Sequence, residues 1–148
     1  MRKLSLIVIC ALTALFFASC QTSDPKDSNG NTPSTVVEKM YQAIQNNQFE
    51  EAAAYCKVPE KVDNSESYNA AKNGTAWKDI VISTMVEQSK ASNYVLKSYE
   101  IVSEEISNTD PNSAKVKTKI TFTKNGADGD AECSFPLKRE NGVWLIIG

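Results

Sequence analysis

Residues 114–123 read Ala-Lys-Val-Lys-Thr-Lys-Ile-Thr-Phe-Thr, and this stretch decides the fold class. Its small and apolar residues alternate with lysines and threonines at every second position. Successive side chains of a β-strand point to opposite faces of the sheet, so this pattern predicts a half-buried strand. The lysine side of the strand is expected to face solvent, where lysines discourage edge-to-edge aggregation.

Three further strands are predicted around this stretch. Tyr94–Ile106 precedes it, and residues 124–129 are expected to form the turn that follows it. The inner face of the next strand is expected to consist of Ala131, Cys133, Phe135 and Leu137. Asn141-Gly142 is typical of a two-residue type I′ hairpin turn, which would pair Glu140 with Val143 and Leu137 with Ile146. The pattern therefore predicts a four-stranded antiparallel sheet.

Helical periodicity comes before the strands. Thr32-Pro33 is expected to cap and begin a helix that ends at Asn46-Asn47. Asn47 is expected to cap a second helix, because Glu50 follows three residues later, as in a capping box. A third helix is predicted over residues 76–90. Its inward side chains are expected to be Trp77, Ile80, Val81, Thr84 and Met85. Helices followed by strands predict an α+β fold.

The N-terminal segment predicts export. A short basic start, Arg2-Lys3, is followed by an apolar run from Leu4 to Phe17, which is too short to span a membrane. Ala18-Ser19-Cys20 then resembles a bacterial lipobox, which implies cleavage before Cys20 and lipid on its thiol. We expect residues 1–19 to be a signal peptide and residues 20–32 a lipidated cysteine with a flexible tether. Residues 33–148 would then form one domain.

The residue after the predicted lipidation site bears on location. Gln21 stands where an aspartate would resemble an inner-membrane retention signal, so we expect a lipid-anchored protein of the cell envelope, at the outer membrane. The sequence leaves open whether it faces the periplasm or the cell surface.

Charge and composition exclude several function classes. The chain has 16 Lys and Arg, 18 Asp and Glu and no histidine. Cleavage after residue 19 removes Arg2 and Lys3 and no acid, which leaves 14 basic residues and a net charge of −4. No basic excess indicates nucleic acid. Without histidine or a Gly-rich phosphate loop, we expect no catalytic residue, no metal site and no cofactor.

Two cysteines remain in the predicted domain after Cys10 is removed and Cys20 is lipidated. Cys56 and Cys133 would reside in an oxidising compartment, where a disulfide persists. The alternative is two buried free thiols that pack as small apolar side chains.

The last predicted strand is apolar on both faces. In the hairpin register, Trp144 and Ile146 point inward, so Val143, Leu145 and Ile147 lie on the outer face. An apolar outer face predicts either an interface, most simply a homodimer, or a helix or loop that covers it.

The order of these elements resembles a known superfamily. Residues 33–148 open with a helix, Asn47-Gln48-Phe49-Glu50-Glu51-Ala52 and a second helix, and end with Asn141-Gly142-Val143-Trp144-Leu145-Ile146. This resembles small lipoproteins of the nuclear-transport-factor-2-like (cystatin-like) superfamily. The resemblance implies helices packed on a curved, cone-shaped sheet, often with a pocket at the wide end, and it implies no activity.

Two functions of different classes follow. The first is binding of a small apolar ligand inside the cone. The expected pocket residues are Met40, Tyr41, Ile44, Trp77, Phe122, Phe135 and Trp144. Aromatic residues at such spacing are more often core, so an open cavity above about 300 Å³ would distinguish a pocket from a filled interior. The second function is an interaction or structural lipoprotein that dimerises or docks on an envelope complex through its sheet face.

Overall fold

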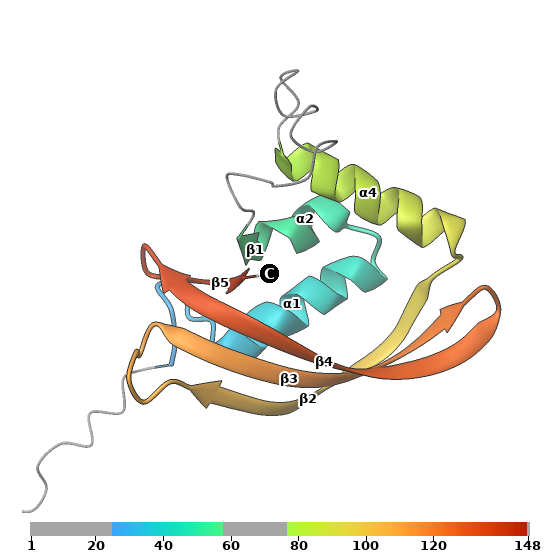
Figure 1. Ribbon diagram of the computed structural model, residues 1–148. Coiled ribbons are helices and arrows are strands. Elements are labelled where there is room, and N and C mark those ends of the chain that lie inside the picture. The colour runs from blue at the N-terminus through green and yellow to red at the C-terminus, as the bar shows by residue number, and fades with distance from the viewer. Residues whose placement is uncertain (1–24, 58–76, 148) are drawn as a thin grey trace, which may run out of the picture.

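In a computed structural model, residues 25–57 and 77–147 are described. The elements within them, in chain order, are α1 (Pro33–Gln45), α2 (Phe49–Ala54), β1 (Cys56–Lys57), α4 (Trp77–Ala91), β2 (Val95–Ile106), β3 (Ser113–Lys124), β4 (Ala127–Glu140) and β5 (Val143–Ile147). Figure 1 shows α1 and α2 on the concave side of a curved sheet, with α4 beyond α2. The α+β class with helices packed on a sheet is therefore confirmed. The predicted signal peptide and Cys20 lie outside the described residues.

The sheet has five strands in the order β1-β5-β4-β3-β2, so the prediction of four strands was one short. Strands β2 to β5 form the predicted antiparallel meander, whereas β1 pairs with β5 in parallel. The backbone N–H of Ile146 donates to the Tyr55 carbonyl oxygen at 2.9 Å, beside the Cys56–Ile146 pair. A two-residue strand is too short to produce an alternating pattern, and its partner lies far away in sequence. Local periodicity could not reveal it.

The two hairpin turns test the strand boundaries. Asn141-Gly142 forms the predicted turn with positive φ at both residues, and Leu137 pairs with Ile146 as expected. The β3–β4 turn consists of Asn125-Gly126 alone, also with positive φ at both positions. The predicted turn over residues 124–129 was therefore wrong. Its Asp and Gly residues suggested a loop, but residues 127–129 continue the ladder opposite β3.

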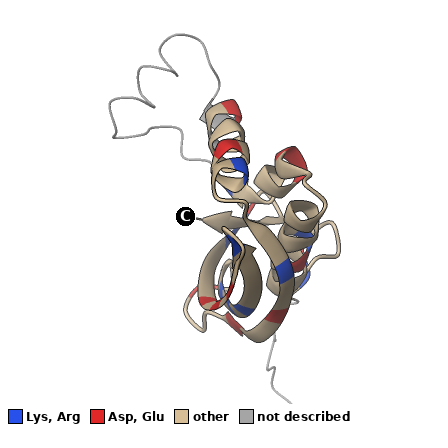
Figure 2. Ribbon diagram, turned by 90° about the vertical axis from the view of Figure 1, so that its right-hand side faces the viewer, with Lys and Arg blue, Asp and Glu red and all other residues tan. Residues whose placement is uncertain are grey.

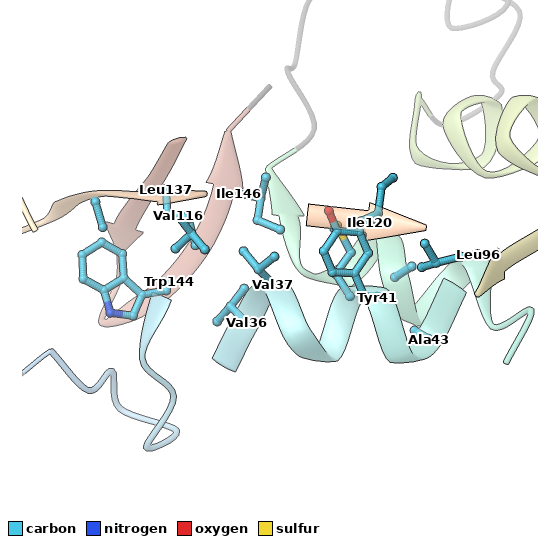
Figure 3. Close-up of a cluster of buried hydrophobic side chains, with 13 residues drawn as sticks. Val36, Val37, Tyr41, Ala43, Leu96, Val116, Ile120, Leu137, Trp144 and Ile146 are labelled. Atoms are coloured by element: carbon cyan, nitrogen blue, oxygen red, sulfur yellow. The ribbon is translucent and has the colours of Figure 1, made fainter. Parts of the chain in front are cut away.

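Helix α1 carries the core. Its predicted cap is present, since the Thr32 hydroxyl accepts a hydrogen bond from the Thr35 backbone N–H at 3.2 Å. The side chains that α1 buries against the sheet follow a helical stripe: Val36, Val37, Met40, Tyr41 and Ala43. Figure 3 shows the apolar cluster running along α1, from Trp144, Leu137 and Val116 at one end to Ile120 and Leu96 at the other. A contiguous apolar core of this kind is the main source of stability.

The second and third helices differ from expectation in detail. Asn47 does not cap α2; it adopts a left-handed conformation with φ of 57° just after α1, and Gln48 precedes α2 without a side-chain cap. Asparagine tolerates the left-handed conformation, so Asn47 terminates α1 rather than capping α2. On α4, Thr84 is exposed rather than inward, and Ile82 and Val86 face α2 across a shallow hollow. The side chains of Trp77 and Val81 lie outside the described residues.

Residues 25–32 of the predicted tether lie against the β4–β5 hairpin. Asp27 is buried, and its carboxylate accepts hydrogen bonds from the backbone N–H groups of Asn29, Asn31 and Trp144 at 2.9, 2.9 and 3.2 Å. The Trp144 indole N–H donates to the Pro25 carbonyl oxygen at 2.8 Å. We call residues 25–32 the strap. Its polar composition suggested a solvated linker, but here the polar groups bind the β4–β5 hairpin instead of water.

Candidate ligand cavity

A cavity of about 720 Å³ opens between the helices and one end of the sheet. Its walls come from five segments: the C-terminal end of α1, the start of α2, the C-terminal half of α4, the start of β2 and the end of β3. The apolar residues in these walls are Ile44, Phe49, Met85, Ala91, Tyr94, Val95, Leu96 and Phe122. This volume falls within the usual range for small-molecule sites. Figure 1 shows the end of α4 and the β3–β4 hairpin on the same side of the molecule.

Three backbone and side-chain contacts hold the cavity walls together. The Asn125 backbone N–H donates to the Ser92 carbonyl oxygen at 2.8 Å, which joins the β3–β4 turn to the segment after α4. The Tyr94 N–H donates to the Ser89 carbonyl oxygen at 3.0 Å. The Gln45 side-chain amide donates to the Lys97 carbonyl oxygen at 3.0 Å, which joins α1 to β2. The cavity is therefore built on connected elements rather than on one loop.

Two stacked aromatic rings form the sheet side of the cavity. Tyr94 and Phe122 stack with their ring centroids 5.3 Å apart. Gly129, opposite Phe122 on β4, makes this arrangement fit, because a Cβ there would lie 2.9 Å from the Phe122 ring. Burial raises the pKa of the Tyr94 hydroxyl, so this pair of rings carries no charge at neutral pH.

The predicted pocket residues divide between this cavity and the core. Ile44 and Phe122 line the cavity. Met40, Tyr41 and Trp144 are buried in the core, and the Phe135 ring packs edge-on against Tyr41 at 5.8 Å, so the prediction that these four residues line a pocket was wrong. The side chain of Trp77 lies outside the described residues. These residues line no pocket because α1 packs directly on the sheet where they lie, which leaves no space between the helix and the sheet.

The sequence reasoning missed several cavity residues. The missed residues include Phe49, Tyr94 and Leu96. They lie near the ends of predicted helices and strands, where an apolar residue gives no indication of whether it faces the core or a cavity. Met85 was expected to be inward, yet it faces the cavity rather than the core. The sequence did contain one indication of a cavity, because several apolar residues lie at the ends of predicted helices and strands, outside the predicted core.

Among the described residues, the core contains one hydrogen-bonded pair of polar side chains. The hydroxyls of Tyr41 and Thr118 hydrogen bond at 2.8 Å, and Tyr41 stacks on Tyr99 with centroids 5.1 Å apart. Desolvation on burial raises the pKa of the Tyr41 hydroxyl. Each hydroxyl satisfies the other, so the pair fits a structural role inside an apolar cluster.

Cys56 and Cys133 are free thiols in the structure, so the hypothesis of a disulfide was wrong. Cys56 lies on β1 beside Ile146, whereas Cys133 lies on β4 opposite Thr118, four residues before the position that pairs with Ile146. The two cysteines belong to different parts of the sheet. Desolvation on burial raises the pKa of the Cys56 thiol.

The outer face of the sheet carries the other predicted surface. Val143, Leu145 and Ile147 are half-buried, and β5 lies between β4 and β1 rather than at the sheet edge. On β3 the outward Lys119 lies beside Glu100 of β2, and its ammonium is 3.5 Å from the carboxylate of Glu132 on β4. Lys115 pairs with Glu105 of β2, whereas Lys117 lies between two serines. Figure 2 shows acidic and basic residues interspersed along the strands. The outward lysines therefore belong to a mixed-charge surface.

The described residues also bear on a metal site and on a membrane-spanning helix. Among them, no three or more acidic, cysteine or histidine side chains gather as a metal site would require. None of the helices described is both long and apolar enough to cross a membrane.

No protein-family model matches the chain, and no curated protein matches it. Among solved structures, the chain is similar to a Campylobacter jejuni protein called "Putative NTF2-like transpeptidase". The two share 15% sequence identity with a TM-score of 0.48, and the match covers 80% of this chain and 99% of that one. A likeness at this level assigns no activity to this chain.

Proposed function

We propose that this chain is a lipid-anchored protein of the cell envelope whose domain binds a small apolar molecule without catalysing a reaction. The observation that carries the proposal is the cavity of about 720 Å³, lined by eight apolar residues from five segments. An apolar hollow of this size favours a ligand, because burying apolar surface contributes roughly 25 cal/mol per Å².

The proposed anchor rests on Cys20 and the apolar run before it. A lipid on Cys20 would keep the binding domain at a membrane, where apolar molecules concentrate. One acyl chain holds a protein marginally, whereas two or three hold it firmly. Replacing Cys20 with alanine is expected to change the membrane partitioning of the protein in its host, and unchanged partitioning would contradict the anchor.

The ligand proposal is tested by filling the cavity. Ala91 is an exposed alanine that lines the cavity at the end of α4, and Ala54 is an exposed alanine at the end of α2 that does not line it. Full-length protein in phosphatidylcholine nanodiscs is titrated with decanol by calorimetry, and the heat from empty nanodiscs is subtracted. We expect saturable one-to-one binding to the wild type and to A54W, and strongly weakened binding to A91W.

Two results would overturn the ligand proposal. One is the absence of saturable binding to the wild type above the empty-nanodisc signal. The other is equal affinity of A91W and A54W, which would place the bound decanol outside this cavity.

A further inference from the structure

The charges around the cavity are asymmetric. Of the described residues that line it, Lys124 alone has a side chain charged at neutral pH, and none of them is an aspartate or glutamate. Lys124 is the last residue of β3, exposed beside the Asn125-Gly126 turn. A ligand in the apolar interior would therefore have a cation at the edge of its site and no acid in the wall.

The nearest acid on the hairpin does not cancel this cation. Asp128 lies opposite Thr123, one position along from Lys124. Its carboxylate accepts hydrogen bonds from the Lys97 ammonium at 2.5 Å and from the Thr123 hydroxyl at 2.8 Å. Lys97 therefore balances the charge of Asp128, and Lys124 contributes the remaining positive charge at this rim.

We propose that the cavity takes an amphiphile with an apolar body and a single negative charge, whose head group is bound at Lys124. The inference rests on the proposed function and adds the chemical class of the ligand. The apolar walls of α4, β2 and β3 would hold the body, while the exposed ammonium stays in the solvent at the mouth. One cation matches a monoanion such as a carboxylate, because a doubly charged phosphate is usually bound by several donors.

The neighbouring polar side chains are consistent with this geometry. Ser92 and Asn125 lie at the same rim, where the Asn125 backbone N–H is already bonded to Ser92. The Ser92 hydroxyl already donates to the Gln88 carbonyl oxygen at 2.6 Å. The side-chain amide of Asn125 is the neutral donor beside Lys124 that can hydrogen bond a carboxylate. The rim thus combines one charge with a neutral hydrogen-bond donor around an apolar interior.

The test compares two probes of equal length and opposite charge. Decanoate and decylammonium are titrated, below their micelle concentrations, into the full-length protein in phosphatidylcholine nanodiscs, with empty nanodiscs as the reference. The wild type is expected to prefer decanoate. In K124E the ratio of the two affinities is expected to reverse, and in K124Q it is expected to fall about threefold to fivefold, as for one solvent-exposed ion pair. Raising the salt concentration should also weaken the preference.

Lys117 provides the matched control. It lies on the same strand and is exposed, but it does not line the cavity. K117Q makes the same charge change and is expected to keep the wild-type ratio.

The outcomes separate the two proposals. If decanol binds but the decanoate-to-decylammonium ratio is the same in the wild type, K124Q and K124E, the inference about charge is wrong and the proposed function stands. Equal changes in K117Q and K124Q would also overturn it, because they would reflect net charge alone. If none of the three probes binds, the proposed function itself fails.

Discussion

Replacing Asp27 with alanine is expected to detach the strap from the β4–β5 hairpin. The Asp27 carboxylate accepts three backbone hydrogen bonds, from Asn29, Asn31 and Trp144. Asn29 is exposed, so water can replace that bond, but Asn31 and Trp144 are buried. A hydrogen bond to a charged group contributes about 1.5–3 kcal/mol, and a buried donor left unpaired costs about as much. Two such bonds give an expected loss of about 3 kcal/mol in the free energy of unfolding.

The assay is thermal unfolding of the full-length protein in nanodiscs, with D130A as the control. Asp130 is an exposed carboxylate on β4, so its removal makes the same charge change without uncovering the strap. A loss of about 3 kcal/mol corresponds to a fall in Tm of roughly 10 °C for a domain of this size. D27N is expected to show a smaller fall in Tm than D27A. Its amide oxygen can still accept from Asn29 and Asn31, whereas its NH₂ group cannot accept from the Trp144 N–H.

Hydrogen exchange reports on the strap itself. In the wild type, the backbone amides of Asn31 and Trp144 are expected to exchange slowly, and in D27A they should exchange much faster. The reasoning is refuted if D27A and D130A have Tm values within about 1 °C of each other and protect these amides equally. A Tm difference of about 1 °C corresponds to well below 1 kcal/mol in the free energy of unfolding.

Three further predictions concern other parts of the domain. G129A places a Cβ 2.9 Å from the Phe122 ring, so it should destabilise the fold by about 1–3 kcal/mol and weaken decanol binding. An unchanged Tm and an unchanged decanol affinity, both measured by calorimetry, would contradict this packing. Hydrogen bonds from Lys138 lower the pKa of Asp110 from 3.8 to about 2, so its contribution to stability is present above about pH 4 and lost as the pH falls toward 2; D110N should flatten this acid limb in urea unfolding. Burial raises the pKa of the Cys56 thiol, so its alkylation at pH 7 should be much slower than in urea, and mass spectrometry should find no disulfide.

The strength of local patterns explains which elements could be predicted. The alternation at residues 114–123 identifies the strand β3, because side-chain direction depends on a few neighbouring residues. The Asn141-Gly142 turn fixes the register of β4 and β5, because turn conformation is equally local. Thr32-Pro33 marks the start of α1 for the same local reason. At residues 127–129, turn-forming residues suggested a loop, but pairing with β3 extended the strand. Tertiary pairing overrode propensity there.

The candidate site was harder to predict because burial does not distinguish core from cavity. Tyr41 and Phe122 are both inward aromatic residues by sequence pattern, yet the first is packed in the core and the second lines the hollow. The difference depends on where α1 ends over the sheet and on how far the end of α4 lies from it, which no local pattern specifies. For the same reason, the sequence offered Lys124 as one more residue of a turn.

By itself, the sequence determined the α+β class, the antiparallel meander and the apolar faces of its helices and strands, because these follow from the period at which apolar residues recur. The tertiary structure alone decided the parallel pairing of β1, the docking of the strap through Asp27 and the position of the cavity. Each of these joins residues far apart in the chain, whose contact depends on how the elements pack rather than on any neighbouring residue.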